Sequence, residues 1–330
     1  MPADAFATHL AKMSKRRLIL GIDGGGSKTA VRIAAVESDG ELRVLGEGYG
    51  GPSNVRAVGR AHAEINLNVA VDAAHRMAGT AEETIDYAVL GLAWSSLPDV
   101  RSFIDNWAEL RALANTVDIV HDADPVLAVG APNGSGIALI VGTGSVAIGS
   151  DGSGRRSVAG GWGHWFGDTG SGFDLGRRAL AAVADAADGV GPETLLVERI
   201  LQQLQTDNPR EILMQLGRSA DMSREIVSLA PILLRAAEDG DEVAREIVTA
   251  AAKGTAQLVR ATADKLGFDC DVPLAIAGGI VCSNTMYRET LLEMLRALGI
   301  EPGSVTVVYE PVEGSLLMAR ERLLKAAQTK

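Results

Sequence analysis

Cysteine is scarce in this chain, and so are the features that accompany metal-binding thiols. The 330 residues include two cysteines, Cys270 and Cys282, and neither belongs to a CxxC pair. Isolated cysteines of this kind are more often buried small hydrophobic residues than metal ligands. Their low number also favours a reducing compartment.

Positive charge and long apolar runs are lacking as well. The chain has 42 acidic residues but only 31 lysines and arginines, and its formal net charge is −11. This excess argues against a nucleic-acid backbone as a partner. No apolar run reaches the length that spans a bilayer. Residues 1–17 lack the apolar core of a secretory signal, so we expect a disordered leader there. These absences predict a cytoplasmic protein that binds neither nucleic acid nor membranes.

Glycine-rich loops are what the chain does have. The first lies in LILGIDGGGSKTAVRIAAV, residues 18–36. It differs from a Walker A loop because Ser27 separates the last glycine from Lys28. It differs from the dinucleotide fingerprint because Thr29 occupies the place of the third glycine. Apolar residues on both sides predict two strands, so the tip DGGGSKT (23–29) closes a hairpin.

Backbone N–H groups exposed at such a tip suit an anion, although an ordinary glycine hairpin is the alternative. The residues expected to bind phosphate are Gly24, Gly25, Gly26, Ser27, Lys28 and Thr29.

The same pattern recurs later in the chain. Residues 137–148 (IALIVGTGSVAI) place a second glycine-rich tip between two apolar strands, and its expected phosphate-binding residues are Gly142, Thr143, Gly144 and Ser145. A third segment, 272–284, is an apolar strand that ends in Gly278 and Gly279. Glycines there let a flat ring approach the backbone closely. Two strand–loop–strand units suggest a duplicated fold in which each half offers one loop to a nucleotide.

In this order the motifs resemble the actin-like ATPase superfamily, and within it the N-acetylglucosamine kinase and BadF/BadG ATPase family. The motifs that carry the resemblance are DGGGSKT (23–29), GPSNV (51–55), HDAD (121–124), VGTGS (141–145), GGWGHWFGDTGSGFDLGRRAL (160–180) and AGGIV (277–281). The resemblance implies an α/β, ribonuclease H-like fold duplicated into two domains around a nucleotide cleft. We expect these domains at 18–121 and 122–314 with a hinge near residue 122, and a C-terminal helix of about 315–330 that packs back on the first.

A candidate general base lies in IVHDADPVLAVG, residues 119–130. Asp124 precedes Pro125, which predicts a helix N-cap. Asp122 is expected at the carboxyl end of a strand, where open α/β sheets place their sites. In the resembled kinases an aspartate at this position accepts the proton of the sugar 6-hydroxyl. A second capping or turn aspartate is the alternative.

The resemblance also implies ATP and Mg²⁺, with Asp23 holding the ion through water. For the sugar we expect Asn54, Asp122, Gly161, Trp162, Gly163 and Asp168. The alternatives make Asn54 a turn residue, Trp162 and Trp165 core anchors, and Asp168 a helix cap.

Two positions depart from the family pattern, Thr169 in place of a glutamate and Val146 in place of a polar residue. We therefore predict an ATP-dependent kinase for the 6-hydroxyl of an amino sugar, most directly N-acetylglucosamine, with glucosamine open. An activator ATPase of acyl-CoA dehydratases, which needs cysteine ligands for an iron–sulfur cluster, and a sugar-responsive regulator are the other hypotheses. A homodimer is possible by resemblance.

Periodicity predicts the remaining elements coarsely. A helix over 56–78 should bury Ile65, Val69, Ala73 and Met77. Strands are expected at 87–93 and 117–123 with a helix at 98–114, and residues 174–265 should be helical with breaks at Gly191-Pro192, Asn208-Pro209 and Gly240.

Overall fold

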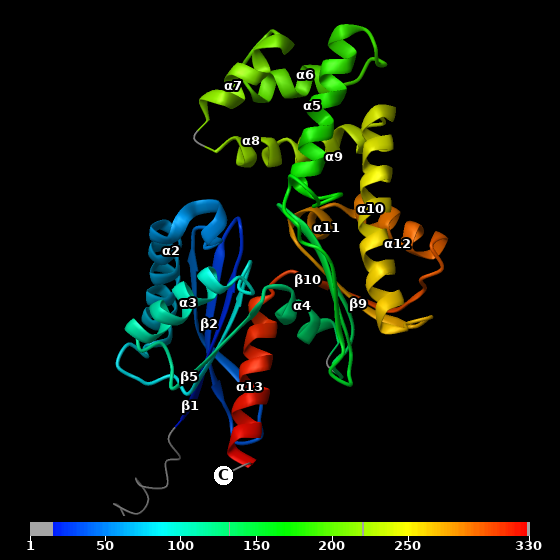
Figure 1. Ribbon diagram of the computed structural model, residues 1–330. Coiled ribbons are helices and arrows are strands. Elements are labelled where there is room, and N and C mark those ends of the chain that lie inside the picture. Colours follow the sequence, from blue (N-terminus) through cyan, green and yellow to red (C-terminus); the bar gives the residue numbers. More distant parts are fainter. Residues whose placement is uncertain (1–15, 132, 220, 329–330) are drawn as a thin grey trace, which may run out of the picture. The chain divides into compact units, whose positions relative to one another are not determined.

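The computed structural model describes residues 16–131, 133–219 and 221–328. The chain divides into two compact units, and Figure 1 shows their elements. Unit 1 contains the chain up to Ala128 and from Glu310 onward, and unit 2 contains Val129–Tyr309. The predicted leader lies largely outside the described residues, and Arg17 at its end already belongs to the first strand.

Unit 1 is built on a five-stranded sheet in the order β3-β2-β1-β4-β5. The strands β1, β2 and β3 pair antiparallel, whereas β4 pairs parallel to β1 and β5 pairs parallel to β4. Its strands are β1 (Arg17–Gly24), β2 (Thr29–Val36), β3 (Leu42–Gly50), β4 (Tyr87–Leu92) and β5 (Thr116–His121). Its helices are α2 (Val55–Ala78), α3 (Pro98–Leu110), α4 (Ala123–Gly130, which runs into unit 2) and α13 (Val312–Gln328).

Helix α2 packs on β3 with a face different from the predicted one. Its buried residues are Ala63, Leu67, Ala70, Val71 and Ala74, while Ile65, Val69 and Met77 are at least half exposed. The reason lies in β3, a strand that the sequence did not predict. A Cβ on Gly48 would lie 1.9 Å from the carbonyl oxygen of Ala70, and one on Gly46 would lie 2.4 Å from that of Ala74. Glycine and alanine therefore bring strand and helix into backbone contact, which large residues would prevent.

Helix α13 belongs to unit 1 although it ends the chain. Leu316 and Ala319 are buried against Ile19, Ala34 and Val89 of the sheet. The hydroxyl of Ser315 donates a hydrogen bond to the carbonyl oxygen of Ile22 at 2.9 Å. The helix thus covers one face of β1, and it begins three residues before the predicted start.

Unit 2 is built on a second five-stranded sheet in the order β10-β9-β6-β7-β8. Its strands are β6 (Ser135–Val141), β7 (Ser145–Asp151), β8 (Arg156–Gly160), β9 (Val272–Ala277) and β10 (Pro302–Val308). Its helices are α5 (Gly172–Asp188), α6 (Leu196–Gln203), the 3-10 helix η1 (Pro209–Glu211), α7 (Ile212–Arg218), α8 (Met222–Ser228), α9 (Ala230–Glu238), α10 (Glu242–Leu266), α11 (Gly279–Ser283) and α12 (Thr285–Ala297). The predicted helical region thus lies within 172–266. No helix of the described residues is long and apolar enough to cross a membrane.

The two sheets repeat one topology. In each, an antiparallel hairpin and a third antiparallel strand stand on one side, and two parallel strands stand on the other. The first and second strands of each unit flank a glycine-rich tip, at 25–28 and at 142–144. This repetition confirms the predicted duplicated α/β fold.

Candidate functional site

The tip of the first hairpin joins β1 to β2 and is closed by a hydrogen bond from Gly25 N–H to the carbonyl oxygen of Lys28. A Cβ on Gly25 would meet nothing within 4 Å, whereas one on Gly24 would lie 2.2 Å from Oγ of Ser53. Gly25 therefore lies at an open surface that a ligand can approach, while Gly24 is needed for packing. The hydroxyl of Thr29 is buried and donates to the carbonyl oxygen of Gly51, so it serves the fold.

The segment with Asn54 rests on this tip. The backbone N–H groups of Ser53 and Asn54 both donate to the carbonyl oxygen of Gly25, at 3.2 and 3.1 Å. The side-chain oxygen of Asn54 accepts from Arg56 N–H at 3.0 Å and caps helix α2. Asn54 is thus a helix cap rather than the turn residue considered above, and this role leaves its amide N–H groups for the predicted sugar contact.

Acidic groups gather at the same end of the sheet in unit 1. Asp23 is the next-to-last residue of β1, and Asp122 directly follows β5. Burial raises the pKa of the Asp23 carboxyl to about 7, and the negative charge of Asp122 acts in the same direction. Lys28 opposes this rise, and Glu310 adds to it.

The side chain of Asp122 is partly open to solvent. Its side chain is 22% exposed, and its Oδ1 lies 2.7 Å from Nδ1 of His121, a contact that becomes an ion pair when the imidazole is protonated. That oxygen is buried and makes no hydrogen bond of acceptable geometry with the described residues. Asp124 differs from the expectation, because helix α4 begins at Ala123. Asp124 therefore lies inside the first turn rather than at the N-cap, and it accepts from His121 N–H at 3.1 Å.

Glu310 is the member of this group that sequence reasoning missed. Its Oε1 pairs with Nζ of Lys28 at 3.4 Å, and its Oε2 is buried without a hydrogen bond in the described residues. Glu310 is 282 positions from Lys28 in the chain. No local pattern in the sequence signals the pair, since it depends on α13 returning to the first sheet.

The second hairpin tip, in unit 2, is fastened to the segment that follows Gly167. Ser145 N–H donates to Oδ1 of Asp168 at 3.2 Å, and the Ser145 hydroxyl donates to the carbonyl oxygen of Thr169 at 2.9 Å. Gly172 N–H donates to the carbonyl oxygen of Gly142 at 2.8 Å. Ser171 caps α5, so Asp168 is not the helix cap considered above. Asp168 instead contacts the tip, and burial raises the pKa of its carboxyl.

The predicted adenosine glycines adjoin this tip. A Cβ on Gly278 would lie 2.4 Å from the carbonyl oxygen of Val141, and a Cβ on Gly142 would lie 3.9 Å from Gly278. Gly278 also has a φ of 104°, which residues other than glycine rarely adopt. A Cβ on Gly279 would meet nothing within 4 Å. The strand β9 and the second tip therefore form one glycine surface within unit 2.

The aromatic residues of GGWGHWFGD lie on the surface. Trp162 is 73% exposed, Trp165 is 80% exposed and Phe166 is 89% exposed. The core-anchor alternative for Trp162 and Trp165 is therefore wrong. His164 packs against the rings of Trp165 and Phe173, with centroids 5.0 and 4.4 Å apart.

The structure shows what surrounds Thr169 and Val146, the two residues that depart from the family pattern. Thr169 turns its methyl group toward helix α10, where a Cβ on Gly254 would lie 2.2 Å from it. Val146 is 7% exposed, and its side chain would contact a Cβ on Gly161 at 3.3 Å. Thr169 is thus a packing residue, and Val146 gives the strand beside Gly161 an apolar surface.

The cysteines have separate environments. Cys270 is exposed, and the thiol of the partly buried Cys282 donates to the carbonyl oxygen of Val308 at 3.6 Å. Among the described residues, no group of three or more His, Cys, Asp and Glu side chains is arranged to hold a metal ion.

The residues present fit ATP better than they fit a directly bound metal. Gly25 in unit 1 and Gly279 in unit 2 each have open space beside their backbone, which a phosphate or a flat ring could approach. Asp23 and Asp122 supply carboxylates of the type that hold Mg²⁺ through water.

Comparisons with known proteins show what this chain is similar to. Residues 20–319 match the BadF/BadG/BcrA/BcrD ATPase family. An N-acetylmuramic acid/N-acetylglucosamine kinase from Clostridium acetobutylicum is 31% identical over 83% of this chain and 89% of its own. An N-acetyl-D-glucosamine kinase from Dictyostelium discoideum is 28% identical over 93% of this chain and 98% of its own.

Solved structures agree on the fold. A Chromobacterium violaceum protein with the provisional name N-acetylglucosamine kinase has a TM-score of 0.70 at 25% identity, over 92% of this chain and 99% of that one. A glucokinase of the ROK family from Streptomyces griseus, solved with glucose and AMPPNP, has a TM-score of 0.56 at 19% identity, over 93% of this chain and 99% of that one. Because the family match spans nearly the whole described chain, this protein belongs to the BadF/BadG/BcrA/BcrD ATPase family.

Proposed function

We propose that this chain is an ATP-dependent kinase that phosphorylates the 6-hydroxyl of an amino sugar, with N-acetylglucosamine as the first candidate. Family membership and the two curated relatives named as kinases of that sugar support the reaction class. The observation that carries the mechanism is Asp122. Its carboxylate follows β5 in the unit that holds the first hairpin tip, and its side chain is 22% exposed.

Asp122 holds the sugar hydroxyl and accepts its proton at a carboxylate oxygen. When bound, Mg-ATP supplies the γ-phosphoryl group. The new bond joins the sugar oxygen to phosphorus, the bond from that phosphorus to the ADP oxygen breaks, and the proton remains on Asp122. Phosphoryl transfer needs little covalent help from a protein, so positioning and charge neutralisation supply most of the catalysis.

The two hairpin tips bind the phosphates through backbone N–H groups, and the open surface over Gly25 supports this role. Lys28 adds a positive charge, for which it exchanges its pairing with Glu310. Asp23 would hold Mg²⁺ through water, where the ion would neutralise phosphate charge, and Gly278 with Gly279 would face the adenosine. Of the residues predicted for these tips, Gly24 and the Thr29 hydroxyl serve packing and Ser145 bonds to the 168–169 segment, and we assign the phosphates to the others.

The sugar contacts come from Asn54 and from the 160–168 segment. Asn54 donates from its amide, since its oxygen caps α2. Asp168 accepts a sugar hydroxyl at its second oxygen, since Oδ1 accepts from Ser145 N–H. Trp162 is exposed enough to stack on a pyranose face. Gly161 and Gly163 offer backbone donors beside it.

The identity of the sugar is open to a direct assay. ADP release should be measured with N-acetylglucosamine, N-acetylmuramic acid, glucosamine, N-acetylmannosamine and glucose, because the Clostridium relative is named for the first two. N-acetylglucosamine should give the highest kcat/KM. Equal or higher turnover of glucosamine would move the assignment to a glucosamine kinase, and no ADP release with any sugar would refute the kinase.

The mechanism is tested by Asp122→Asn, which keeps the shape of the side chain but cannot accept the proton. A general base contributes on the order of 10²–10⁴-fold, so kcat should fall by about that factor while the sugar KM changes little. Asp105→Asn on the exposed face of α3 is the matched control and should turn over at the wild-type rate. An active Asp122→Asn enzyme would remove Asp122 from the mechanism.

A further inference from the structure

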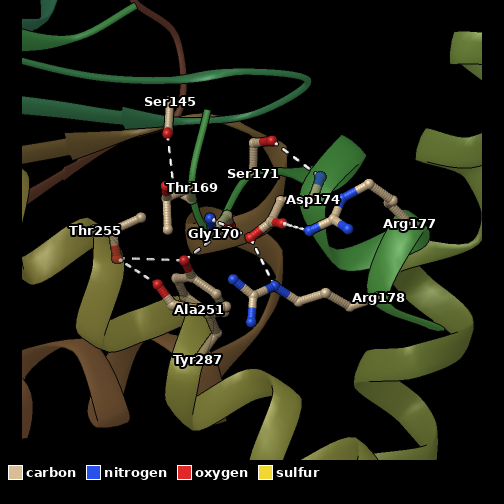
Figure 2. Close-up of polar contacts among 10 residues, drawn as sticks. All are labelled: Ser145, Thr169, Gly170, Ser171, Asp174, Arg177, Arg178, Ala251, Thr255 and Tyr287. Carbon is tan, nitrogen blue, oxygen red and sulfur yellow. Dashed lines mark hydrogen bonds and ion pairs between the residues drawn. The ribbon is translucent and has the colours of Figure 1, made fainter. Parts of the chain in front are cut away.

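The backbone N–H and the backbone carbonyl group of Gly170 are both held by side chains. Its N–H donates to Oδ2 of Asp174 at 2.9 Å, and its carbonyl oxygen accepts from the hydroxyl of Tyr287 at 2.9 Å (Figure 2). Gly170 has a φ of 77°, and a Cβ there would lie 2.5 Å from the carbonyl oxygen of Ala251. We call Gly170, Asp174 and Tyr287 the Gly170 clamp.

Both sides of the Gly170 clamp are built rigidly. Asp174 is 7% exposed, and its two oxygens also accept from Arg177 at 3.0 Å and Arg178 at 2.9 Å. Tyr287 has no exposed surface, and its hydroxyl lies 3.3 Å from that of Thr255 on α10. A buried polar network in which every member is bonded fixes one geometry, because each unmade bond would be costly.

The clamp lies next to the second hairpin tip. Thr169, which precedes Gly170, accepts from the Ser145 hydroxyl through its carbonyl oxygen, as Figure 2 shows. Asp168 accepts from Ser145 N–H, and Gly172 N–H donates to the carbonyl oxygen of Gly142. Both ends of the tip are therefore bonded to the segment that contains Gly170.

The hydroxyl of Tyr287, on α12, makes a long-range hydrogen bond to the loop that contains Gly170, Asp174 of α5 makes a local one, and Thr255 of α10 acts on the loop only through Tyr287. In the same loop Asp168, which is not a glycine, has a φ of 56°. Strain of this kind persists only where the surroundings enforce it. Its effect is to present one surface of the loop to the tip at 142–145.

We propose that Tyr287 is a positioning residue for nucleotide binding: by holding Gly170, it fixes the loop that orients the backbone N–H groups of the second tip. This role rests on the proposed function, in which that tip binds the phosphates of ATP. Tyr287 itself is fully buried and touches no ligand. Its influence on ATP passes through Gly170, Thr169 and Ser145.

The test is Tyr287→Phe, which removes one hydroxyl and keeps the packed ring. The burial-matched control is Thr262→Val on α10, which removes an equally buried hydroxyl that donates to Leu258 and contacts no part of the loop. The dissociation constant of AMPPNP is measured by calorimetry well below the melting temperature of each protein, together with hydrogen exchange over 142–145 and 168–172. KM values for ATP and for the sugar complete the set.

Tyr287→Phe should weaken AMPPNP binding by about fivefold, the scale of one neutral hydrogen bond, and speed exchange in both segments. The sugar KM should stay within about twofold, and Thr262→Val should match wild type in nucleotide affinity. If Tyr287→Phe lowers the melting temperature but binds AMPPNP as wild type does, Tyr287 is only structural. Should Tyr287→Phe fail to fold, Thr255→Val is measured in the same way. If Thr255→Val binds AMPPNP as tightly as wild type does, the proposed role of Tyr287 is wrong.

The failure of this proposal differs from a failure of the proposed function. Wild-type protein that binds AMPPNP but phosphorylates no sugar refutes the sugar kinase and leaves the affinity comparison in force. Wild-type protein that binds no nucleotide refutes both.

Discussion

In unit 1 the negative charge of Asp122, which directly follows β5, acts on the buried carboxyl of Asp23 near the end of β1. Burial raises the pKa of Asp23 to about 7, and the charge of Asp122 adds to the rise. A negative charge beside a buried carboxyl makes that carboxyl hold its proton more tightly. A cation brought by the substrate would relieve the same repulsion.

This pKa makes stability depend on pH in a defined window. The folded carboxyl of Asp23 titrates near pH 7 and the unfolded one near 3.8, so the folded state holds its proton more tightly. The resulting stabilisation is complete below pH 3.8 and is lost as the pH rises through 7. Asp23→Asn should therefore raise the melting temperature of ligand-free protein more at pH 8 than at pH 5, measured by thermal unfolding.

Asp269→Asn, an exposed change in unit 2, is the control and should give the same small shift at both pH values. Equal shifts for Asp23→Asn at pH 5 and pH 8 would contradict the raised pKa.

Asp168 should affect two substrates rather than one. Because its Oδ1 accepts from Ser145 N–H, Asp168→Ala removes support from the second tip as well as a sugar contact. We expect KM to rise for both ATP and the sugar, by about threefold to tenfold each for the loss of one hydrogen bond. Asp168→Asn still accepts from Ser145 and should raise only the sugar KM. Initial-rate kinetics with each substrate varied would show the difference, and identical behaviour of the two variants would count against it.

Trp162→Ala should separate binding from stability. A core tryptophan replaced by alanine costs about 3–5 kcal/mol, but an exposed residue usually costs within about 0.5 kcal/mol. Since Trp162 is 73% exposed, its melting temperature should match wild type. The sugar KM should rise and the ATP KM should not. A large loss of stability would show that the ring is buried in solution.

Gly48 should tolerate no side chain. Gly48→Ala places a Cβ 1.9 Å from the carbonyl oxygen of Ala70, a backbone atom that cannot move aside. Overpacking of this kind costs about 1–3 kcal/mol or more. Gly217→Ala is the contrasting variant, because that glycine lies in helix α7 with open space around it and should gain roughly 0.5–1 kcal/mol in helix propensity. Urea unfolding should show a lower free energy of unfolding for Gly48→Ala and a higher one for Gly217→Ala than for wild type.

The sequence predicted the hairpins and the duplication well because their signals are local. Apolar strands around glycines need no partner elsewhere in the chain to be recognised. The buried face of α2 was wrong because Gly46 and Gly48 of an unpredicted strand favour alanine at the contact over Ile65 and Val69. The position of Asp124 was wrong because α4 begins before the proline that was taken as its start.

The candidate site was predictable in part for the same reason. The tips, Asp23 and Asp122 stand in motifs that can be read in sequence. Tyr287 is 117 positions from Gly170, and Glu310 is 282 positions from Lys28, so no spacing rule relates them. Long-range polar contacts of this sort follow from tertiary packing, which a single sequence does not display.

The return of α13 to the first sheet has a consequence for synthesis on the ribosome. Unit 2 is continuous in the chain, but unit 1 needs Ser315 and Leu316 against β1 before its sheet is covered. The hairpin made first is thus the last to be completed, while the inserted unit can fold as soon as it emerges. During translation the apolar face of β1 therefore stays uncovered until α13 has been made, and a stop codon before residue 312 would leave that face open.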